Sequence, residues 1–171
     1  MLKVSPEKFF VYCALIFGII LITIIPPFQS PDEDSHFKKA YVVSKGQLFP
    51  SSQDGVVGYE LPTDIVQYIS EGYKSYSEVI LNDKTPQDYS ETVFKSFSTV
   101  ETTPFVYIAP SIGIVFAKVT TKLIGMDNIS IVTMLQFARF FCLILYVFLV
   151  YLAIKTTPIL KKHFALLDYF Q

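Results

Sequence analysis

The chain has 171 residues, of which 51% are hydrophobic and 16% aromatic, and its formal net charge is only −1. This apolar fraction exceeds what a water-soluble domain of this length needs, so part of the chain must be buried in lipid. The charge is unevenly distributed, because residues 29 to 103 carry net −6 and the remainder net +5. No glycine-rich phosphate loop is present, so the sequence gives no support for binding nucleotides or nucleic acid.

The first apolar segment, residues 9 to 28, contains no charged side chain and predicts a transmembrane helix. Its length at about 1.5 Å per residue matches the roughly 30 Å of a hydrocarbon core. Lysines precede it and acids follow it, so the positive-inside rule places residues 1 to 8 in the cytoplasm. Pro26 and Pro27 are expected to end the helix. A cleaved signal peptide is the alternative, although no small-x-small site follows the segment.

Residues 29 to 103 then form a long extracytoplasmic loop, in which we predict short juxtamembrane helices. Asp34 or Ser35 would cap the first of these helices, which would end at Gly46 and lie along the membrane surface. Its larger side chains share one face: Phe37, Ala40 and Tyr41. Further helices are predicted over residues 64 to 81 and from Thr85 to about Phe97, and the rest of the loop is predicted to form turns.

Two more apolar segments follow the loop. Residues 129 to 154 predict a transmembrane helix that contains Arg139, and residues 104 to 124 predict a shorter one whose lysines must reach toward an interface. If the shorter segment spans, the lysines after the last helix lie outside, whereas a re-entrant segment places them inside. We prefer three spans, because two helices joined by a short turn explain the hydrophobicity of both segments. The predicted fold is therefore all-α, with about three transmembrane helices and a truncated polar tail at residues 155 to 171.

An acidic motif opens the loop just where the chain leaves the bilayer. It consists of Asp32, Glu33 and Asp34, with His36 two residues later. These acids would favour the positive N-terminal end of a helix dipole, which requires no chemistry. Alternatively, a partly desolvated carboxylate there can accept a proton from an acceptor hydroxyl or hold a divalent cation against a lipid phosphate. Both explanations stay open from the residues alone.

Single polar residues near the motif also have two interpretations each. His36 would carry a proton or bind a metal, or it would be a surface residue that forms local hydrogen bonds. Arg139 lies within an apolar helix, where an unpaired guanidinium is costly, so it should face a protein partner, a phosphate or the membrane surface.

The order of these features carries a resemblance. The chain has one span, then PPFQSPDEDSHFKKAYVVSKGQLFP, a polar stretch, TPFVYIAPSIGIVFAKVTTKLIG, and a span that contains ARFF. It resembles a family of uncharacterised predicted bacterial membrane proteins. That family looks like the type C membrane glycosyltransferases, including protein mannosyltransferases and aminoarabinose transferases. In those enzymes an acidic pair follows the first helix and a proline-tyrosine segment opens the second, which Pro104, Phe105 and Tyr107 match.

The resemblance implies a function and a set of site residues. It implies that Asp32 is the catalytic or metal-binding acid and Glu33 its companion. His36, Arg139 and Tyr107 would then bind the substrate, a sugar linked to a polyprenyl phosphate, for an inverting transfer on the outer face. A divalent cation, Mg or Mn, would be held by Asp32 and Asp34. The membrane would be the bacterial cytoplasmic (inner) membrane.

The resemblance also sets limits on what this chain does by itself. Such enzymes cross the membrane roughly ten or more times. We therefore expect residues 1 to 171 to be either the N-terminal part of a longer enzyme or a short gene product that has lost the part completing the donor pocket, and to be inactive alone. The alternative function is a non-catalytic membrane subunit or scaffold, which would present the outer loop to a partner in cell-envelope assembly.

Overall fold

The computed structural model describes residues 5 to 71, 89 to 126 and 129 to 157. In chain order the elements are α1 (Pro6–Ile24), α2 (Glu33–Ser44), β1 (Ser51–Gln53), β2 (Val56–Pro62), α3 (Thr63–Ser70), β3 (Thr92–Lys95), the 3-10 helix η1 (Pro104–Tyr107), α5 (Ile108–Leu123) and α6 (Ile131–Thr156). In the described residues, three helical segments are long and apolar enough to cross a membrane: Pro6–Ile24, Pro104–Leu123 and Ile131–Thr156. This confirms the three apolar segments, and α1 ends just before Pro26 and Pro27 as predicted.

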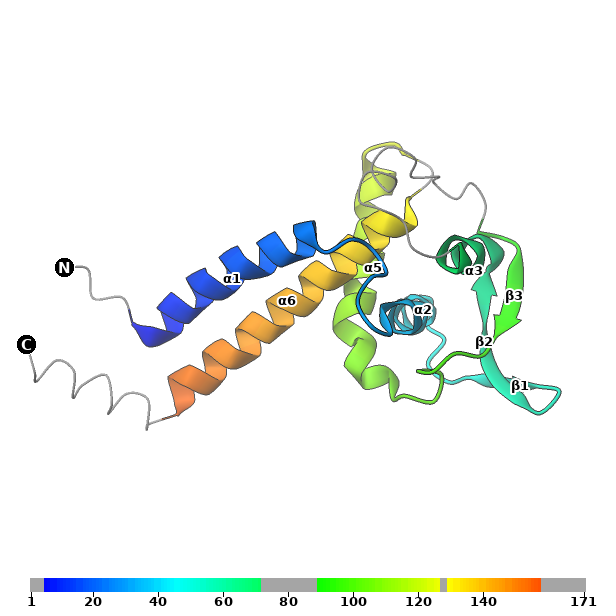
Figure 1. The fold of residues 1–171 in the computed structure, drawn as a ribbon, viewed down its shortest axis with the longest axis horizontal. Coiled ribbons are helices and arrows are strands. Elements are labelled where there is room, and N and C mark those ends of the chain that lie inside the picture. The colour runs from blue at the N-terminus through cyan, green and yellow to red at the C-terminus, as the bar shows by residue number, and fades with distance from the viewer. Residues whose placement is uncertain (1–4, 72–88, 127–128, 158–171) are drawn as a thin grey trace, which may run out of the picture.

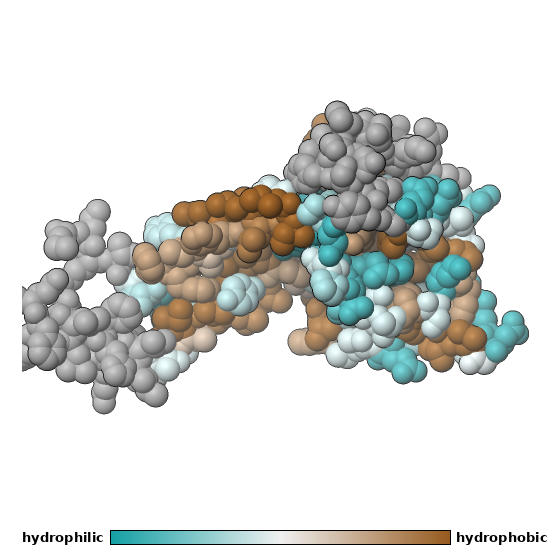
Figure 2. Space-filling model, viewed as in Figure 1, coloured by the Kyte–Doolittle hydropathy of each residue, from teal (hydrophilic) through white to brown (hydrophobic). Residues whose placement is uncertain are grey.

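The long helices are arranged as a pair and a crossing helix. Figure 1 shows α1 and α6 side by side and antiparallel, with α5 running across the end of the pair rather than along it. Inside the pair, the Leu143 side chain fills the space beside Gly18, where a Cβ would come within 2.4 Å of it. Apolar residues cover most of the visible face of the pair, and polar residues gather around its far end (Figure 2).

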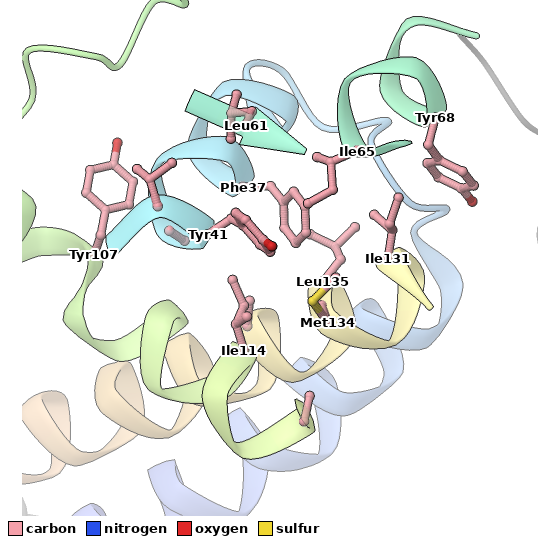
Figure 3. Packing of buried hydrophobic residues seen from close by; sticks show 14 of the residues in the cluster. Phe37, Tyr41, Leu61, Ile65, Tyr68, Tyr107, Ile114, Ile131, Met134 and Leu135 are labelled. Carbon is pink, nitrogen blue, oxygen red and sulfur yellow. The ribbon is translucent and has the colours of Figure 1, made fainter. Parts of the chain in front are cut away.

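The far end carries a compact unit, which we call the cap. It consists of α2, α3, the strands, η1, α5 and the first turns of α6. Figure 3 shows its core, where side chains from α2, β2 and α3 meet side chains from α5 and α6. The predicted shared face of α2 is confirmed, because Phe37, Ala40 and Tyr41 are all buried. This face packs against other parts of the chain, including α5 and β2, whereas we expected the helix to lie along the membrane surface.

The cap contains a three-stranded antiparallel sheet in the order β1-β2-β3, so the all-α prediction was wrong for this region. The turn between β1 and β2 is Asp54-Gly55, with φ of 49° and 79°. Asp-Gly favours the left-handed conformations of a two-residue hairpin turn. The sequence predicts turns here but not the strands on either side. The predicted helix from Thr85 to Phe97 is also wrong where it is described, because Thr92–Lys95 forms strand β3 beside β2. Its β-branched and aromatic residues suit a strand.

The helix boundaries inside the loop differ from the predictions by a few residues. The N-cap of α2 is Asp32, in the left-handed conformation, so Asp34 and Ser35 lie inside the first turn and do not cap it. Gly46 follows the end of α2 with φ of 83°, as expected for a helix stop. The helix predicted over residues 64 to 81 is shorter, because α3, Thr63–Ser70, ends with Glu71 as its C-cap. Residues 72 to 81 lie outside the described residues.

One lysine is buried in the cap. Lys39 is only 1% exposed, and its Nζ donates hydrogen bonds to the Tyr59 hydroxyl at 2.7 Å and to the Val100 carbonyl at 2.6 Å. The ammonium also lies 4.5 Å from the centre of the Tyr59 ring. Burial lowers the pKa of Lys39. The side chain therefore ties α2 to β2 and to the segment before η1.

Candidate functional site

A pocket of about 500 Å³ lies where α2, η1 and α6 meet. We call it the boundary pocket, because it lies where the cap meets the helix pair: its lining residue Arg139 contacts the chain at the end of α1. Its polar lining residues are Glu33, His36, Thr102, Tyr107 and Arg139. The other lining residues are Phe37, Ala40, Val106, Pro110, Leu135, Ala138 and Cys142. A mostly apolar wall therefore adjoins a small group of polar and charged side chains.

The strongest polar interaction in the pocket joins Arg139 to Glu33. Arg139 Nε and Nη2 donate to the two carboxylate oxygens of Glu33, each at 2.7 Å, and both side chains are 13% exposed. This two-pronged geometry is the strongest that a guanidinium and a carboxylate form. It joins α6 to the first turn of α2 across more than a hundred residues of sequence.

Arg139 also binds the end of α1. Its Nη1 donates to the Ile25 carbonyl at 2.8 Å, and its Nη2 donates to the Pro26 carbonyl at 3.1 Å. The last carbonyls of a helix have no partner within it and carry the negative end of the helix dipole. Ile25 is the C-cap of α1 and Pro26 follows it, so one partly buried guanidinium binds both the end of α1 and Glu33.

His36 and Tyr107 form a second polar pair. The Tyr107 hydroxyl and His36 Nδ1 share a hydrogen bond of 2.9 Å, and their ring centroids are 5.8 Å apart. Tyr107 is 4% exposed and His36 is exposed, so the pair extends from the cap interior to the surface. Because one histidine nitrogen is engaged, the other is available to a ligand or to water.

The other two acids of the motif differ in their contacts. Asp34 accepts a hydrogen bond of 2.8 Å from Lys38, one helical turn later. Burial acts to raise the pKa of Asp34, but the hydrogen bond and charge of Lys38 outweigh it and hold that pKa below its ordinary value. Asp32 is exposed with φ of 58°, a conformation that aspartate tolerates better than most residues, and its carboxylate forms no cap hydrogen bond.

The structure therefore brings four of the six predicted site residues together. Glu33, His36, Tyr107 and Arg139 line one pocket, whereas Asp32 and Asp34 do not line it. Sequence reasoning missed Thr102, Val106 and Cys142. Only Cys142 had a signal, because it lies three residues after Arg139 and so on the same face of a helix. In the described part of the chain, no three His, Cys, Asp or Glu side chains form a metal-binding group. A cation at Asp32 and Asp34 would need further ligands, such as phosphate oxygens.

Three helical segments that are long and apolar enough to span, together with a cap at one end of the α1–α6 pair, define a membrane protein. Its candidate site is the pocket beside the end of α1. The chain belongs to the DUF2142 family of predicted membrane proteins, whose family model matches residues 15 to 167. Comparison with curated proteins gives no match, and comparison with solved structures gives none either.

Proposed function

We propose that this chain forms the donor-binding end of a membrane glycosyltransferase, which transfers a sugar from a polyprenyl-phosphate donor to an acceptor on the outer face of a bacterial cytoplasmic membrane. The observation that carries the proposal is the boundary pocket. A polyprenyl phosphate combines a long apolar chain with an anionic head, and it needs a site with the same two characters side by side. The pocket combines them next to the exposed apolar surface of α1 and α6.

The polar end of the pocket suits a phosphate-linked sugar. The exposed His36 ring and the Tyr107 hydroxyl offer hydrogen bonds to sugar or phosphate oxygens. Arg139 supplies positive charge, although its guanidinium already serves Glu33 and the end of α1, so it would attract the phosphate at longer range. The apolar side, with Val106, Leu135 and Cys142, would receive the first units of the polyprenyl chain.

The chemical step needs a base near the reacting sugar. In an inverting transfer, an acceptor hydroxyl oxygen attacks the anomeric carbon, the bond from that carbon to the phosphate oxygen breaks, and the polyprenyl phosphate leaves with the bonding electrons. The acceptor proton passes to a carboxylate. Asp32 is the acid of the motif that has neither the Arg139 pairing of Glu33 nor the Lys38 pairing of Asp34 among the described residues. It is therefore the proposed base.

We also propose that the acidic motif holds a divalent cation. Carboxylate and phosphate oxygens are the ligands that Mg²⁺ and Mn²⁺ prefer, and such ions commonly bridge one or two carboxylates to a substrate phosphate. The carboxylates of Asp32 and Asp34 would supply the protein ligands. When bound, the ion would neutralise charge on the departing phosphate.

A specific observation favours the second candidate, a non-catalytic subunit or scaffold in cell-envelope assembly. The pairing of Glu33 with Arg139 and of Asp34 with Lys38 accounts for two of the three acids by structural roles alone. In that case the acidic motif would only hold the cap on the helix pair.

Replacing Asp32 with asparagine in the full-length protein separates the two candidates. Asparagine keeps the shape and tolerates the left-handed conformation, so the fold should survive while the base is lost. In membranes supplied with a panel of polyprenyl-phosphate-linked hexoses, we expect the release of free polyprenyl phosphate to fall at least about 100-fold. Chromatography of the extracted lipids measures this release whichever acceptor is used.

Asp54→Asn is the matched control, because Asp54 is also exposed and has a positive φ of 49° but lies in the distant β1–β2 turn. It should release polyprenyl phosphate at the wild-type rate. If Asp32→Asn also keeps that rate, the acidic motif is only a helix start and Asp32 has no catalytic role.

Closing the boundary pocket should prevent donor binding. Val106 lines the pocket yet is 58% exposed, so Val106→Trp can fill the opening without overpacking the core. We expect labelling by a photoreactive polyprenyl phosphate to fall about tenfold or more. Val119→Trp changes an equally exposed valine of α5 outside the pocket and should label normally. Equal labelling of both variants would place the donor elsewhere.

A further inference from the structure

A second pocket, of about 450 Å³, lies between the C-terminal ends of α2 and α5. Three lysines line it, Lys45, Lys118 and Lys122, so we call it the lysine pocket. Its other lining residues are Tyr41, Tyr89, Thr121, Met126 and Ile129. It shares no lining residue with the boundary pocket.

The described lining of the lysine pocket carries three positive charges. None of the lining residues that the structure describes is acidic. Within the described residues the side-chain ion pairs join Lys38 to Asp34 and Arg139 to Glu33, and neither involves these lysines. Lys118 Nζ lies 4.2 Å from the centre of the Tyr41 ring, and burial raises the pKa of Tyr41 to about 12, so its hydroxyl stays neutral. Three lysines that share a cavity, with no carboxylate among its described lining residues, favour an anionic occupant.

Contacts with α6 place α5 at the end of the helix pair. A Cβ at Gly113, near the middle of α5, would lie 2.5 Å from the Phe137 carbonyl, and the Phe116 ring lies 5.6 Å from the ring of Phe141. Between Phe137 and Phe141, Arg139 binds the C-terminal carbonyls of α1. The middle of α5 is therefore level with the end of α1 and not with its centre.

The exposed face of α5 suits the surface of a bilayer. Large apolar side chains recur along it at intervals of three or four residues, and their exposed fractions lie between 43% and 80%. They are Ile108, Ile112, Val115, Val119 and Leu123. An apolar stripe with lysines beside it is the pattern of helices that lie in the membrane interface, where the lysines reach the level of the lipid phosphates.

We propose that the lysine pocket binds the phosphate of an anionic membrane lipid, with α5 lying along the membrane surface on the cap side. The three ammonium groups would surround the phosphate oxygens, while the apolar stripe of α5 contacts the upper part of the acyl chains. This site goes beyond the proposed sugar transfer, because it uses other residues and needs no reaction. Its role would be to fix the cap against the membrane.

Native mass spectrometry of the full-length protein with bound lipids tests the site. Phosphatidylglycerol should be retained in preference to phosphatidylcholine, whose own cationic group opposes the lysines. In Lys45→Gln/Lys122→Gln, which changes two exposed lysines of the pocket, the affinity for phosphatidylglycerol should fall about tenfold or more. The control Lys38→Gln/Lys95→Gln removes the same charge outside the pocket and should bind normally.

Three results would overturn the proposal. Equal losses in the two double variants would mean that overall charge, and not this pocket, holds the lipid. No loss in the pocket variant would remove the site altogether. If inorganic phosphate alone displaces phosphatidylglycerol at equal concentration, the pocket is a site for a soluble anion. None of these results depends on sugar transfer, so a failure here leaves that proposal to its own test.

Discussion

Replacing Arg139 with glutamine is expected to destabilise the fold by up to about 3 kcal/mol, the lower end of the usual cost of removing one partner from a buried ion pair, because this pair is only partly buried. The change leaves the Glu33 carboxylate at 13% exposure without its cation. It also removes the donors that the Ile25 and Pro26 carbonyls use. Because glutamine is uncharged and shorter, it cannot replace these contacts. Unfolding in mixed micelles, followed by circular dichroism, measures the free energy.

Two further variants show whether the effect belongs to this pair. Glu33→Gln should cost less than Arg139→Gln, because an amide oxygen can still accept from Arg139 and the α1 carbonyls keep their donors. Lys38→Gln breaks the more exposed ion pair with Asp34 and should change stability by less than about 1 kcal/mol. If Arg139→Gln costs no more than Lys38→Gln, Arg139 does not hold α1, α2 and α6 together.

Much of the fold could be predicted because the apolar segments are long. A run of about twenty uncharged residues has few alternatives to a helix in lipid, and a proline pair ends it at a definite place. The inner face of α2 was also predictable, because Phe37, Ala40 and Tyr41 recur with helical spacing. These features depend on neighbours within a few residues along the chain.

The sheet was missed for the opposite reason. Strand β3 is four residues long, and among the described residues its strand partner is β2, thirty or more residues earlier. A capping-box-like pattern nearby outweighed its weak strand signal. The Asp54-Gly55 turn was a local signal for a hairpin, but β1 is only three residues long and lacks an alternating apolar pattern.

Several residues of the candidate site could be predicted from the sequence, but the contacts that each of them makes could not. An arginine within an apolar helix had to find a partner, and the acidic motif was the nearest supply of negative charge at that depth. The sequence could not show that Glu33, and not Asp32, would be that partner. Asp32 is the N-cap and has the left-handed conformation, whereas Glu33 is the first residue of α2 and pairs with Arg139. These backbone conformations are not visible in the order of the residues. The three lysines of the second pocket were likewise spread over two helices far apart in sequence.

The final prediction concerns how often the chain crosses the membrane. In a variant with Cys13 and Cys142 replaced by alanine, single cysteines at Ser52, Met126 and Thr156 report the β1–β2 hairpin, the end of α5 and the end of α6. All three positions are exposed. If α5 lies along the surface, an impermeant maleimide added to intact cells should label the cysteines at 52 and 126, while the cysteine at 156 reacts only after lysis.

With three spans, positions 52 and 156 would be labelled in intact cells and position 126 only after lysis. In that arrangement α5 carries position 126 to the cytoplasm and α6 returns position 156 to the outside. The labelling is all-or-none, so the two arrangements cannot be confused. The two-crossing result would also place Lys155 on the same side as the N-terminal lysines, as the positive-inside rule requires. Labelling of position 126 only after lysis would refute the surface position of α5, and the lysine pocket would then face away from the outer lipid phosphates.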